Sequence, residues 1–255
     1  SGETISLGIG QGYNNFTMLQ IAHAMGTVAN NGLKMKPHLV REVVDVETKA
    51  STLVAKEPIG QLPLSPENLE VIKKGMIGVN VEGTSATSFI GAQYVSAGKT
   101  GTAQVFTVKQ NEKYNAAAID ERMRDHALFV AFAPADDPKV ALAMVVENAG
   151  FGAQNAAPIA RRVFDFVITG QYPSQEDIEA VQRGQATRPI GKPRPVASVP
   201  WPPKAAELAA EEPVVAASAA EKAASAAAKA ASAATKSASA AASAVAQKPA
   251  TTSPR

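Results

Sequence analysis

The chain has 255 residues, which is enough for one sizeable hydrophobic core and a small additional segment. Its formal net charge of +2 gives no argument for nucleic-acid binding, and the lack of cysteine excludes disulfides and thiolate metal sites. No apolar run approaches the ~20 residues of a membrane-spanning helix, so we expect either a soluble protein or a piece of a longer one.

The first part of the chain predicts a strand, a loop and a helix. Residues 1–9 form a mixed run that predicts a strand, and Gly10-Gln11-Gly12 ends it in what we expect to be an ordinary loop. Thr17 and Gln20 have the spacing of a capping box, which predicts a helix start. Residues at helical spacing and a terminating glycine define this helix: Leu19, Ala22, Met25, Ala29 and Gly32.

The next segment predicts a pair of strands and a second helix. Residues 37–45 are rich in valine and predict a strand that pairs with residues 52–55 across a polar turn. Ser65-Pro66-Glu67 predicts a helix start, since proline is favoured in the first helical turn. Apolar residues continue this helix at three- and four-residue steps, namely Leu69, Ile72, Met76 and Val79. Residues 83–89 predict one more short helical turn.

Apolar and β-branched residues then surround the sequence Gly98-Lys99-Thr100-Gly101-Thr102, which predicts a strand. Lysine supplies a compact cation with three donors, and threonine supplies a hydroxyl. Gly101 leaves one flank of the strand bare, so that another chain can lie against it. These features suit a strand that holds a peptide with a free carboxylate. The triplet Lys-Thr-Gly also recurs by chance, and by itself it favours an ordinary surface lysine.

The remaining folded elements are predicted from dense apolar runs. Residues 107–125 are polar and predict a long loop, and residues 126–133 and 140–146 predict an antiparallel hairpin across a Pro/Asp turn. Residues 157–169 predict a helix ended by Gly170, with five side chains facing inward: Ile159, Val163, Phe164, Val167 and Ile168. A last short helix is predicted to start at Ser174 and to carry Ile178 and Val181.

The composition changes sharply after about Gln185. A proline-rich stretch is followed by residues 205–246, which are nearly all Ala, Ser and Lys. This region holds too few large apolar side chains to bury a core, which predicts a solvated low-complexity tail without tertiary contacts. We therefore divide the chain into a folded part, residues 1–185, and a tail, residues 186–255.

The order of several motifs resembles class B penicillin-binding proteins. The motifs are Leu7-Gly8-Ile9-Gly10-Gln11-Gly12, Leu19-Gln20-Ile21-Ala22, Ala29-Asn30-Asn31-Gly32 and Ala97-Gly98-Lys99-Thr100-Gly101-Thr102-Ala103-Gln104. The run from Arg124 to Pro134 and the sequence Val145-Val146-Glu147-Asn148 look like the penicillin-binding protein 2 branch in particular. The resemblance covers about residues 1–185 and implies an α+β fold, the C-terminal part of a transpeptidase domain with a mainly antiparallel sheet flanked by helices.

This resemblance implies a peptidoglycan D,D-transpeptidase. In that family a serine attacks the D-Ala-D-Ala bond of a stem peptide, an amine from a neighbouring stem resolves the acyl-enzyme, and β-lactams acylate the same serine. The implied partners are peptidoglycan stem peptides, β-lactam antibiotics and a membrane glycosyltransferase, at the periplasmic face of a bacterial inner membrane. No nucleic acid, cofactor or metal is implied, and His23, His38 and His126 show no ligand spacing.

The resemblance also implies roles for four residues. Lys99 is expected to keep the cleft positive and to contact a serine hydroxyl of an upstream Ser-x-Asn motif. Thr100 is expected to bind the terminal carboxylate of the donor peptide, with the Thr102 hydroxyl assisting. Gly101 leaves room for the substrate backbone. The backbone N–H of Thr102 is expected to form half of the oxyanion hole, where one donor is commonly worth ~10²–10³ in rate.

Two other motifs of the family, Ser-x-x-Lys and Ser-x-Asn, are expected upstream of the matched region. Ser96-Ala97-Gly98-Lys99 spells Ser-x-x-Lys, but on a strand positions three apart point to opposite faces, whereas the catalytic pair must share a helix face. We therefore expect that this chain lacks the nucleophile and is not itself acylated.

Two other classes of function remain as alternatives. Gly98-Lys99-Thr100 fits the end of a nucleotide-binding P-loop, but the first glycine of that motif is replaced by Gln93, and a helix would have to follow the lysine. The other alternative is a non-catalytic interaction or scaffold piece.

Overall fold

The computed structural model describes residues 2–105, 114–115, 118–185 and 187–199. Residues 107–113 and 116–117 of the predicted loop, and the tail from residue 200 onward, therefore lie outside the described residues. Residues 1–181 and 185–199 form one compact unit, and the fold described below belongs to that unit.

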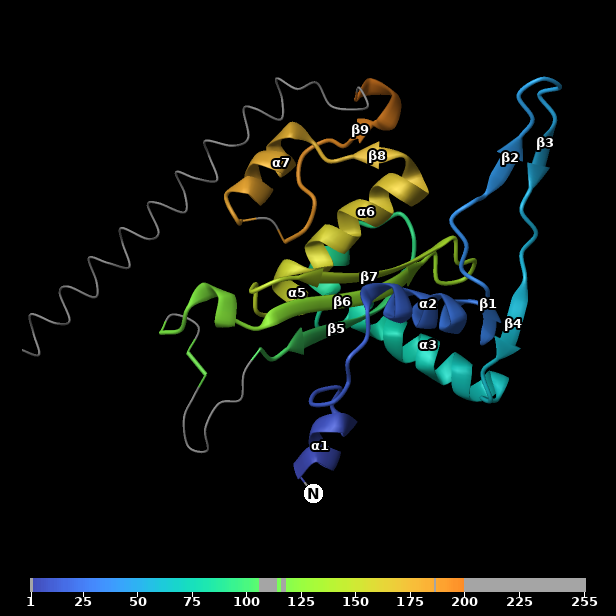
Figure 1. The fold of residues 1–255 in the computed structure, drawn as a ribbon. Helices are drawn as coiled ribbons and strands as arrows, with labels where there is room; N and C mark the ends of the chain where they lie inside the picture. Colours follow the sequence, from blue (N-terminus) through green and yellow to red (C-terminus); the bar gives the residue numbers. More distant parts are fainter. Residues whose placement is uncertain (1, 106–113, 116–117, 186, 200–255) are drawn as a thin grey trace, which may run out of the picture. The chain divides into compact units, whose positions relative to one another are not determined.

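A three-stranded antiparallel sheet is the centre of this unit, in the order β5-β6-β7 (Figure 1). Its strands are β5 (Ala97–Ala103), β6 (His126–Ala133) and β7 (Val140–Val146). In the register, Thr100 lies opposite Phe129, and Phe129 lies opposite Met144. The predicted Lys-Thr-Gly strand and the predicted hairpin after it are both confirmed.

Side chains of β6 alternate between two hydrophobic layers, as the two-residue period of a strand requires. Ala127, Phe129 and Ala131 belong to one cluster of buried residues, whose helical members come from the elements on one face of the sheet. Phe132 packs with Ala97 and Ala29 in the second cluster, on the other face. The elements of the first face are α4 (Ala86–Phe89), α5 (Gly152–Asn155) and α6 (Ala157–Thr169), and those of the second are α2 (Met18–Ala29) and α3 (Pro66–Val81). The predicted α+β class is confirmed.

The two helices of the second face start at the predicted caps. The Thr17 side chain accepts a hydrogen bond from the Gln20 N–H, and the Gln20 side chain accepts one from the Thr17 N–H, so the capping box is complete. Ser65 caps α3 in the same way by accepting from the Asn68 N–H. Gly32 has φ +85°, the left-handed conformation expected after the end of α2.

Helix α6 has the predicted bounds, but three of its five predicted inward side chains are not buried. Ile159, Val163 and Val167 are 40%, 37% and 51% exposed. Small residues face the sheet instead, because Ala157 and Ala160 allow the helix axis to approach the strands more closely than branched side chains would. The other two predictions are confirmed, because Phe164 is fully buried and Ile168 is partly buried against the same cluster.

The prediction of a strand at residues 1–9 is wrong, because residues 2–8 form helix α1 (Gly2–Gly8). A strand needs a neighbour to accept its backbone hydrogen bonds, whereas a helix satisfies its own. Here the backbone bonds are local, such as the one from the Ile9 N–H to the Ile5 carbonyl.

Two short ladders form an arm beside the helices of the second face (Figure 1). Strand β2 (Glu42–Val44) pairs with β3 (Ser51–Leu53) across the polar turn, as predicted. Strand β1 (Leu33–Met35) pairs with β4 (Pro58–Gln61), and the sequence analysis did not predict this ladder.

Residues 187–199 contact the part of the fold that precedes them. Strand β8 (Gln171–Tyr172) pairs with β9 (Arg194–Pro195), and a 3-10 turn, η2 (Val196–Ser198), follows. The Ile190 N–H donates to a carboxylate oxygen of Asp177, at the start of the predicted last helix, α7 (Gln175–Gln182). For residues 187–199 the predicted lack of tertiary contacts is therefore wrong, and for residues 200–255 it stays a prediction.

Among the described residues, no helix combines the length and the apolar character that crossing a membrane requires.

Phe164 gives a first prediction, about stability. Its fully buried ring packs against those of Phe89 and Tyr94, with centroids 6.5 Å and 6.2 Å apart. Phe164→Ala is expected to lower the free energy of unfolding by about 3–5 kcal/mol, because it leaves a cavity between α6 and the sheet. Val167→Ala, on the half-exposed side of the same helix, is expected to change it by less than about 0.5 kcal/mol. Urea unfolding of both variants measures the difference, and equal losses would contradict this account of the core.

Candidate functional site

Strand β5 is hydrogen-bonded on one side only, among the strands that the structure describes. In an antiparallel ladder the N–H and C=O of one residue point to the same side, and successive residues alternate. The Thr102 carbonyl accepts from a side chain outside the sheet, so the Thr102 N–H also faces the free edge. Thr100 and Gln104 share this orientation. The strand therefore presents a row of backbone groups that an extended peptide could use.

Gln11 occupies part of this free edge. Its Nε2 donates to the Thr102 carbonyl at 2.7 Å, and its Oε1 accepts from the Gln104 N–H at 3.4 Å. Gly10 and Gly12, at φ +82° and +68°, let the loop turn on either side of Gln11. The prediction of an ordinary loop missed this contact, because nothing in the spacing of Gly-Gln-Gly indicates a partner about ninety residues away.

Lys99 is exposed, and its Nζ donates to the Thr100 carbonyl at 2.7 Å. Its side chain leaves the strand on the face opposite to those of Thr100 and Thr102, because side chains alternate along a strand. Within the part of the chain that the structure describes, no ion pair neutralises this ammonium. The site therefore keeps a positive charge at the free edge of β5.

The Thr100 hydroxyl lies 3.0 Å from the hydroxyl of Thr84, which precedes α4. Both hydroxyls are accessible, since Thr84 is exposed and Thr100 is half-buried. The sequence analysis did not single out Thr84. Its place beside the Lys-Thr-Gly motif depends on the path of the chain between α3 and α4.

A buried polar cluster lies behind these two threonines. Asn80 Nδ2 donates to the Ser96 hydroxyl at 2.9 Å, and the Ser85 hydroxyl donates to Asn80 Oδ1 at 2.6 Å. The three residues are 5%, 4% and 1% exposed. Because buried polar groups are costly when unpaired, these bonds hold the end of α3, the start of α4 and the start of β5 together.

Ser96 is consequently not placed as a nucleophile. It is buried, and its hydroxyl accepts from Asn80, whereas Lys99 Nζ bonds to the Thr100 carbonyl. Serine and lysine do not share a helix face here, because β5 starts at Ala97, directly after Ser96. The P-loop alternative is contradicted by the same strand, because a P-loop lysine opens a helix, whereas Lys99 lies inside β5.

Gly101 and Gly152 let helix α5 come against the backbone of the site. A Cβ at Gly152 would lie 2.1 Å from the Leu128 carbonyl oxygen and 2.6 Å from that of Gly101. No side chain fits there without a backbone shift. The glycine of the Lys-Thr-Gly motif therefore has a packing role in this fold as well as the expected role of leaving room for a substrate.

Tyr94 anchors the segment before β5 to helix α6. Its hydroxyl donates to Asp165 at 2.9 Å, and Arg161 binds the same carboxylate through Nε at 2.8 Å. Burial, and then the negative charge of Asp165, raise the pKa of the Tyr94 hydroxyl well above its ordinary value. The phenol therefore stays neutral and serves as a fixed donor.

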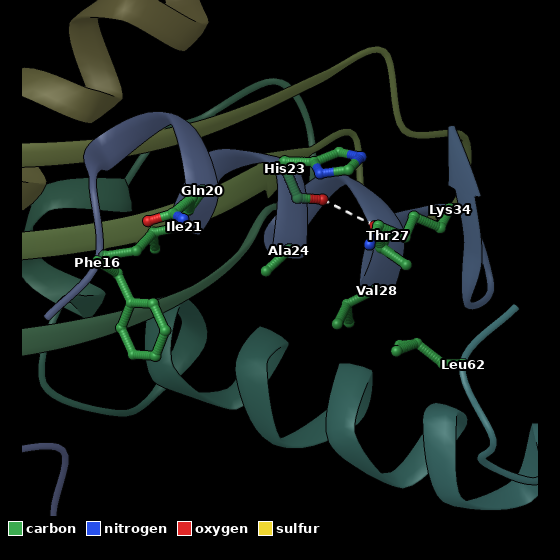
Figure 2. A pocket seen from close by; sticks show the side chains of 9 residues that line it. All are labelled: Phe16, Gln20, Ile21, His23, Ala24, Thr27, Val28, Lys34 and Leu62. Carbon is green, nitrogen blue, oxygen red and sulfur yellow. Dashed lines mark hydrogen bonds between the residues drawn. The ribbon is translucent and has the colours of Figure 1, made fainter. Parts of the chain in front are cut away.

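A separate apolar groove of about 650 Å³ runs along α2 (Figure 2). Its lining includes Phe16, Ile21, Val28 and Leu62 and no residue of β5. The groove is therefore not part of the Lys99 site.

Among the described residues, no group of His, Asp or Glu side chains is arranged to hold a metal ion.

Comparisons with known proteins agree with this geometry. The family "Penicillin binding protein transpeptidase domain" matches residues 1–165. The Peptidoglycan D,D-transpeptidase MrdA of Haemophilus influenzae is 42% identical over 184 residues, which are 69% of this chain and 27% of that protein. The protein of the same name from Escherichia coli K12 is 40% identical over 172 residues, 66% of this chain and 27% of the relative. The chain thus spans little more than a quarter of the length of these relatives.

Two solved structures are similar in fold. One is that of Pseudomonas aeruginosa PBP2 in complex with WCK 5153, with a TM-score of 0.50 and 36% identity over 64% of this chain and 33% of that one. The other is the ceftriaxone acyl-enzyme complex of penicillin-binding protein A from Mycobacterium tuberculosis, with a TM-score of 0.52 and 28% identity over 64% of this chain and 35% of that one.

The close approach at Gly152 gives a second prediction. Gly152→Ala is expected to destabilise the protein and to displace β5, because the added methyl group overlaps two carbonyl oxygens. Gly75→Ala is the matched control. A Cβ at Gly75 meets nothing within 4 Å, so this change inside α3 is expected to stabilise by about 0.5–1 kcal/mol. Thermal unfolding measures both, and a neutral Gly152→Ala would show that α5 does not press on the β5–β6 ladder.

The bridge from Gln11 gives a third prediction. Gln11→Ala removes the acceptor for the Gln104 N–H, so amide exchange at Gln104 is expected to accelerate, by about two- to tenfold for one modest hydrogen bond. Exchange at Phe129, inside the β5–β6–β7 ladder, serves as the control and should stay unchanged. Unaltered exchange at Gln104 would mean that the Gln11 contact does not protect the edge of β5 in solution.

Proposed function

The chain belongs to the penicillin-binding protein transpeptidase family, and on this premise we propose that it supplies the Lys-Thr-Gly strand of a peptidoglycan D,D-transpeptidase. The activity belongs to a longer protein, because the curated relatives are more than three times as long as the matched region. The nucleophilic serine lies in a segment of that protein outside these 255 residues, which hold no Ser-x-x-Lys pair in helical geometry.

The observation that carries the proposal is the free edge of β5 beside an unneutralised lysine.

In the proposed reaction, the serine oxygen attacks the carbonyl carbon of the D-Ala-D-Ala bond. The C–N bond breaks, and the terminal D-alanine leaves as an amine after taking up a proton. The amine of a neighbouring stem peptide then attacks the ester, and the serine is released with its proton restored.

Thr102 stabilises the oxyanion of this reaction in the proposal. Its N–H points to the free edge, where it can donate to the oxygen on which negative charge develops. The second donor is the N–H of the nucleophilic serine. A fixed backbone donor needs no reorganisation during the reaction, because the β5–β6 ladder holds the strand rigidly on its other side.

Lys99 and Thr100 recognise the substrate in the proposal. The Lys99 ammonium attracts the C-terminal carboxylate of the stem peptide and makes the catalytic hydroxyls more acidic. The Thr100 hydroxyl donates to that carboxylate. Gly101, the next residue of β5 after Thr100, has no side chain, so that the peptide can approach the strand.

Gln11 must yield to an extended substrate that adds to β5 as a new strand. The Thr102 carbonyl that such a peptide needs now accepts from Gln11 Nε2. A hydrogen bond from the substrate backbone would replace the one from the Gln11 side chain. The exchange is nearly neutral in free energy, since a typical net hydrogen bond is worth about 0.5–1.5 kcal/mol. The contact therefore keeps the edge ordered without closing it.

Partners and location follow from the same proposal. Stem peptides and β-lactams are the proposed ligands, and the ceftriaxone acyl-enzyme complex of the Mycobacterium tuberculosis relative supports the β-lactams. A membrane glycosyltransferase as partner, and the periplasmic face of a bacterial inner membrane as location, stay predictions for the longer protein. The 255 residues alone are not expected to be labelled by a fluorescent penicillin, whereas the longer protein is expected to be labelled covalently.

Lys99 gives the fourth prediction, to be tested in the full-length protein. Lys99→Ala is expected to slow acylation by penicillin about ten- to a hundredfold, because a charge-assisted hydrogen bond is lost from the transition state. Lys99→Arg is expected to recover part of the rate, since a planar guanidinium replaces a compact charge poorly.

Lys74→Ala is the control, because Lys74 is an exposed lysine on α3 whose partner is Glu70. The second-order acylation rate and the melting temperature are measured together for all variants. A normal rate with Lys99→Ala would remove β5 from the active site. A rate lost together with the fold would make Lys99 a structural residue.

A further inference from the structure

We propose that Thr84 is a positioning residue that orients the Thr100 hydroxyl toward the substrate carboxylate. This inference rests on the proposed function, because it concerns the same carboxylate site. Thr84 lies outside the Lys-Thr-Gly motif, between α3 and α4, and its hydroxyl is 3.0 Å from that of Thr100. Both side chains remain accessible to a ligand at the edge of β5.

Proton counting shows what Thr84 adds. A threonine hydroxyl has one proton to donate and two lone pairs that accept. If Thr84 donates to Thr100, the Thr100 oxygen is satisfied as an acceptor, and its own proton is free to point at the carboxylate. A carboxylate only accepts, so it favours this arrangement over the reverse one. Thr84 therefore sets the direction of the hydrogen bond that Thr100 makes.

The position of Thr84 is fixed by its neighbours rather than by its own contact. The adjacent Ser85 is 1% exposed, and its hydroxyl donates to Asn80, which in turn donates to Ser96 at the start of β5. Gly83, on the other side, has no room for a side chain, because a Cβ there would lie 2.7 Å from the Cα of Val79. The loop therefore holds the Thr84 hydroxyl beside β5 before a ligand arrives.

The exposed threonine pair contributes little to the stability of the fold. If the bond between the two accessible hydroxyls is lost, water can form hydrogen bonds with them instead. Water cannot do this for the buried polar groups of the Asn80 cluster. The loss of the Thr84 hydroxyl should thus change carboxylate recognition and leave the melting temperature almost unaltered. This separation distinguishes a positioning role from a structural one.

The test uses the full-length protein with Thr84→Val, which keeps the shape and removes the hydroxyl, and Thr84→Ser, which keeps the hydroxyl. Thr87→Val, at an exposed threonine on α4, is the control. Each variant is acylated with benzylpenicillin and with its methyl ester, which lacks the carboxylate charge. Thr84→Val is expected to slow acylation by benzylpenicillin about three- to tenfold, the effect of one lost hydrogen bond. The already slow reaction of the ester should be unchanged, and Thr84→Ser and Thr87→Val should react like the wild type.

Three outcomes overturn the inference. An unchanged benzylpenicillin rate in Thr84→Val, with Lys99→Ala still slow, would remove Thr84 from the site and leave the proposed function standing. Equal losses with benzylpenicillin and the ester would make Thr84 structural. A wild-type protein that is not acylated at all would overturn the proposed function together with the inference. Thr84→Ala replaces Thr84→Val if the valine variant melts more than a few degrees below the wild type.

Discussion

The one-sided pairing of β5 is the constraint on which the site depends. The ladder with β6 fixes the strand, and the alternation of an antiparallel pair then points the backbone groups of Thr100, Thr102 and Gln104 away from the sheet. In a central strand these backbone groups would be paired with a second neighbouring strand. Without β6, the backbone of β5 would not be held in a fixed position. The expected oxyanion donor and the groups that bind Gln11 are therefore consequences of edge position.

Small residues let the surrounding elements reach this strand. A Cβ at Gly98 would lie 2.6 Å from the Phe129 ring and 3.1 Å from Asn80 Oδ1, and one at Gly152 would overlap the Leu128 carbonyl. On β6 and α6, alanines alternate with the large rings of Phe129 and Phe164, which fill the space between them. The helices thus pack directly against the backbone of the sheet, and even one added methyl group there is expected to destabilise the fold.

Buried polar groups attach the edges of the fold to this core. Arg161 and Asp165 pair beside Tyr94, and Arg162 binds the fully buried Asp177 through two bonds of 2.8 Å and 2.7 Å. Such pairs add little net stability over apolar packing but penalise any arrangement that separates them. The first pair holds the segment before β5, and the second holds α7 and the chain that returns at Ile190. Their role is to specify where the ends of the fold lie.

Local patterns in the sequence were enough to predict most of the helices and strands. The capping box at Thr17, the bounds of α6 and the β6–β7 hairpin depend on neighbours in the chain, so period and cap residues predict them. The Lys-Thr-Gly triplet and the order of the other motifs were enough for the family. Tertiary structure decided what depends on distant partners: the helical start of the chain, the inward face of α6, the bridge from Gln11 and the place of Thr84 beside Thr100. The physical reason is that a hydrogen bond or a close approach between residues far apart in sequence leaves no periodicity in either segment.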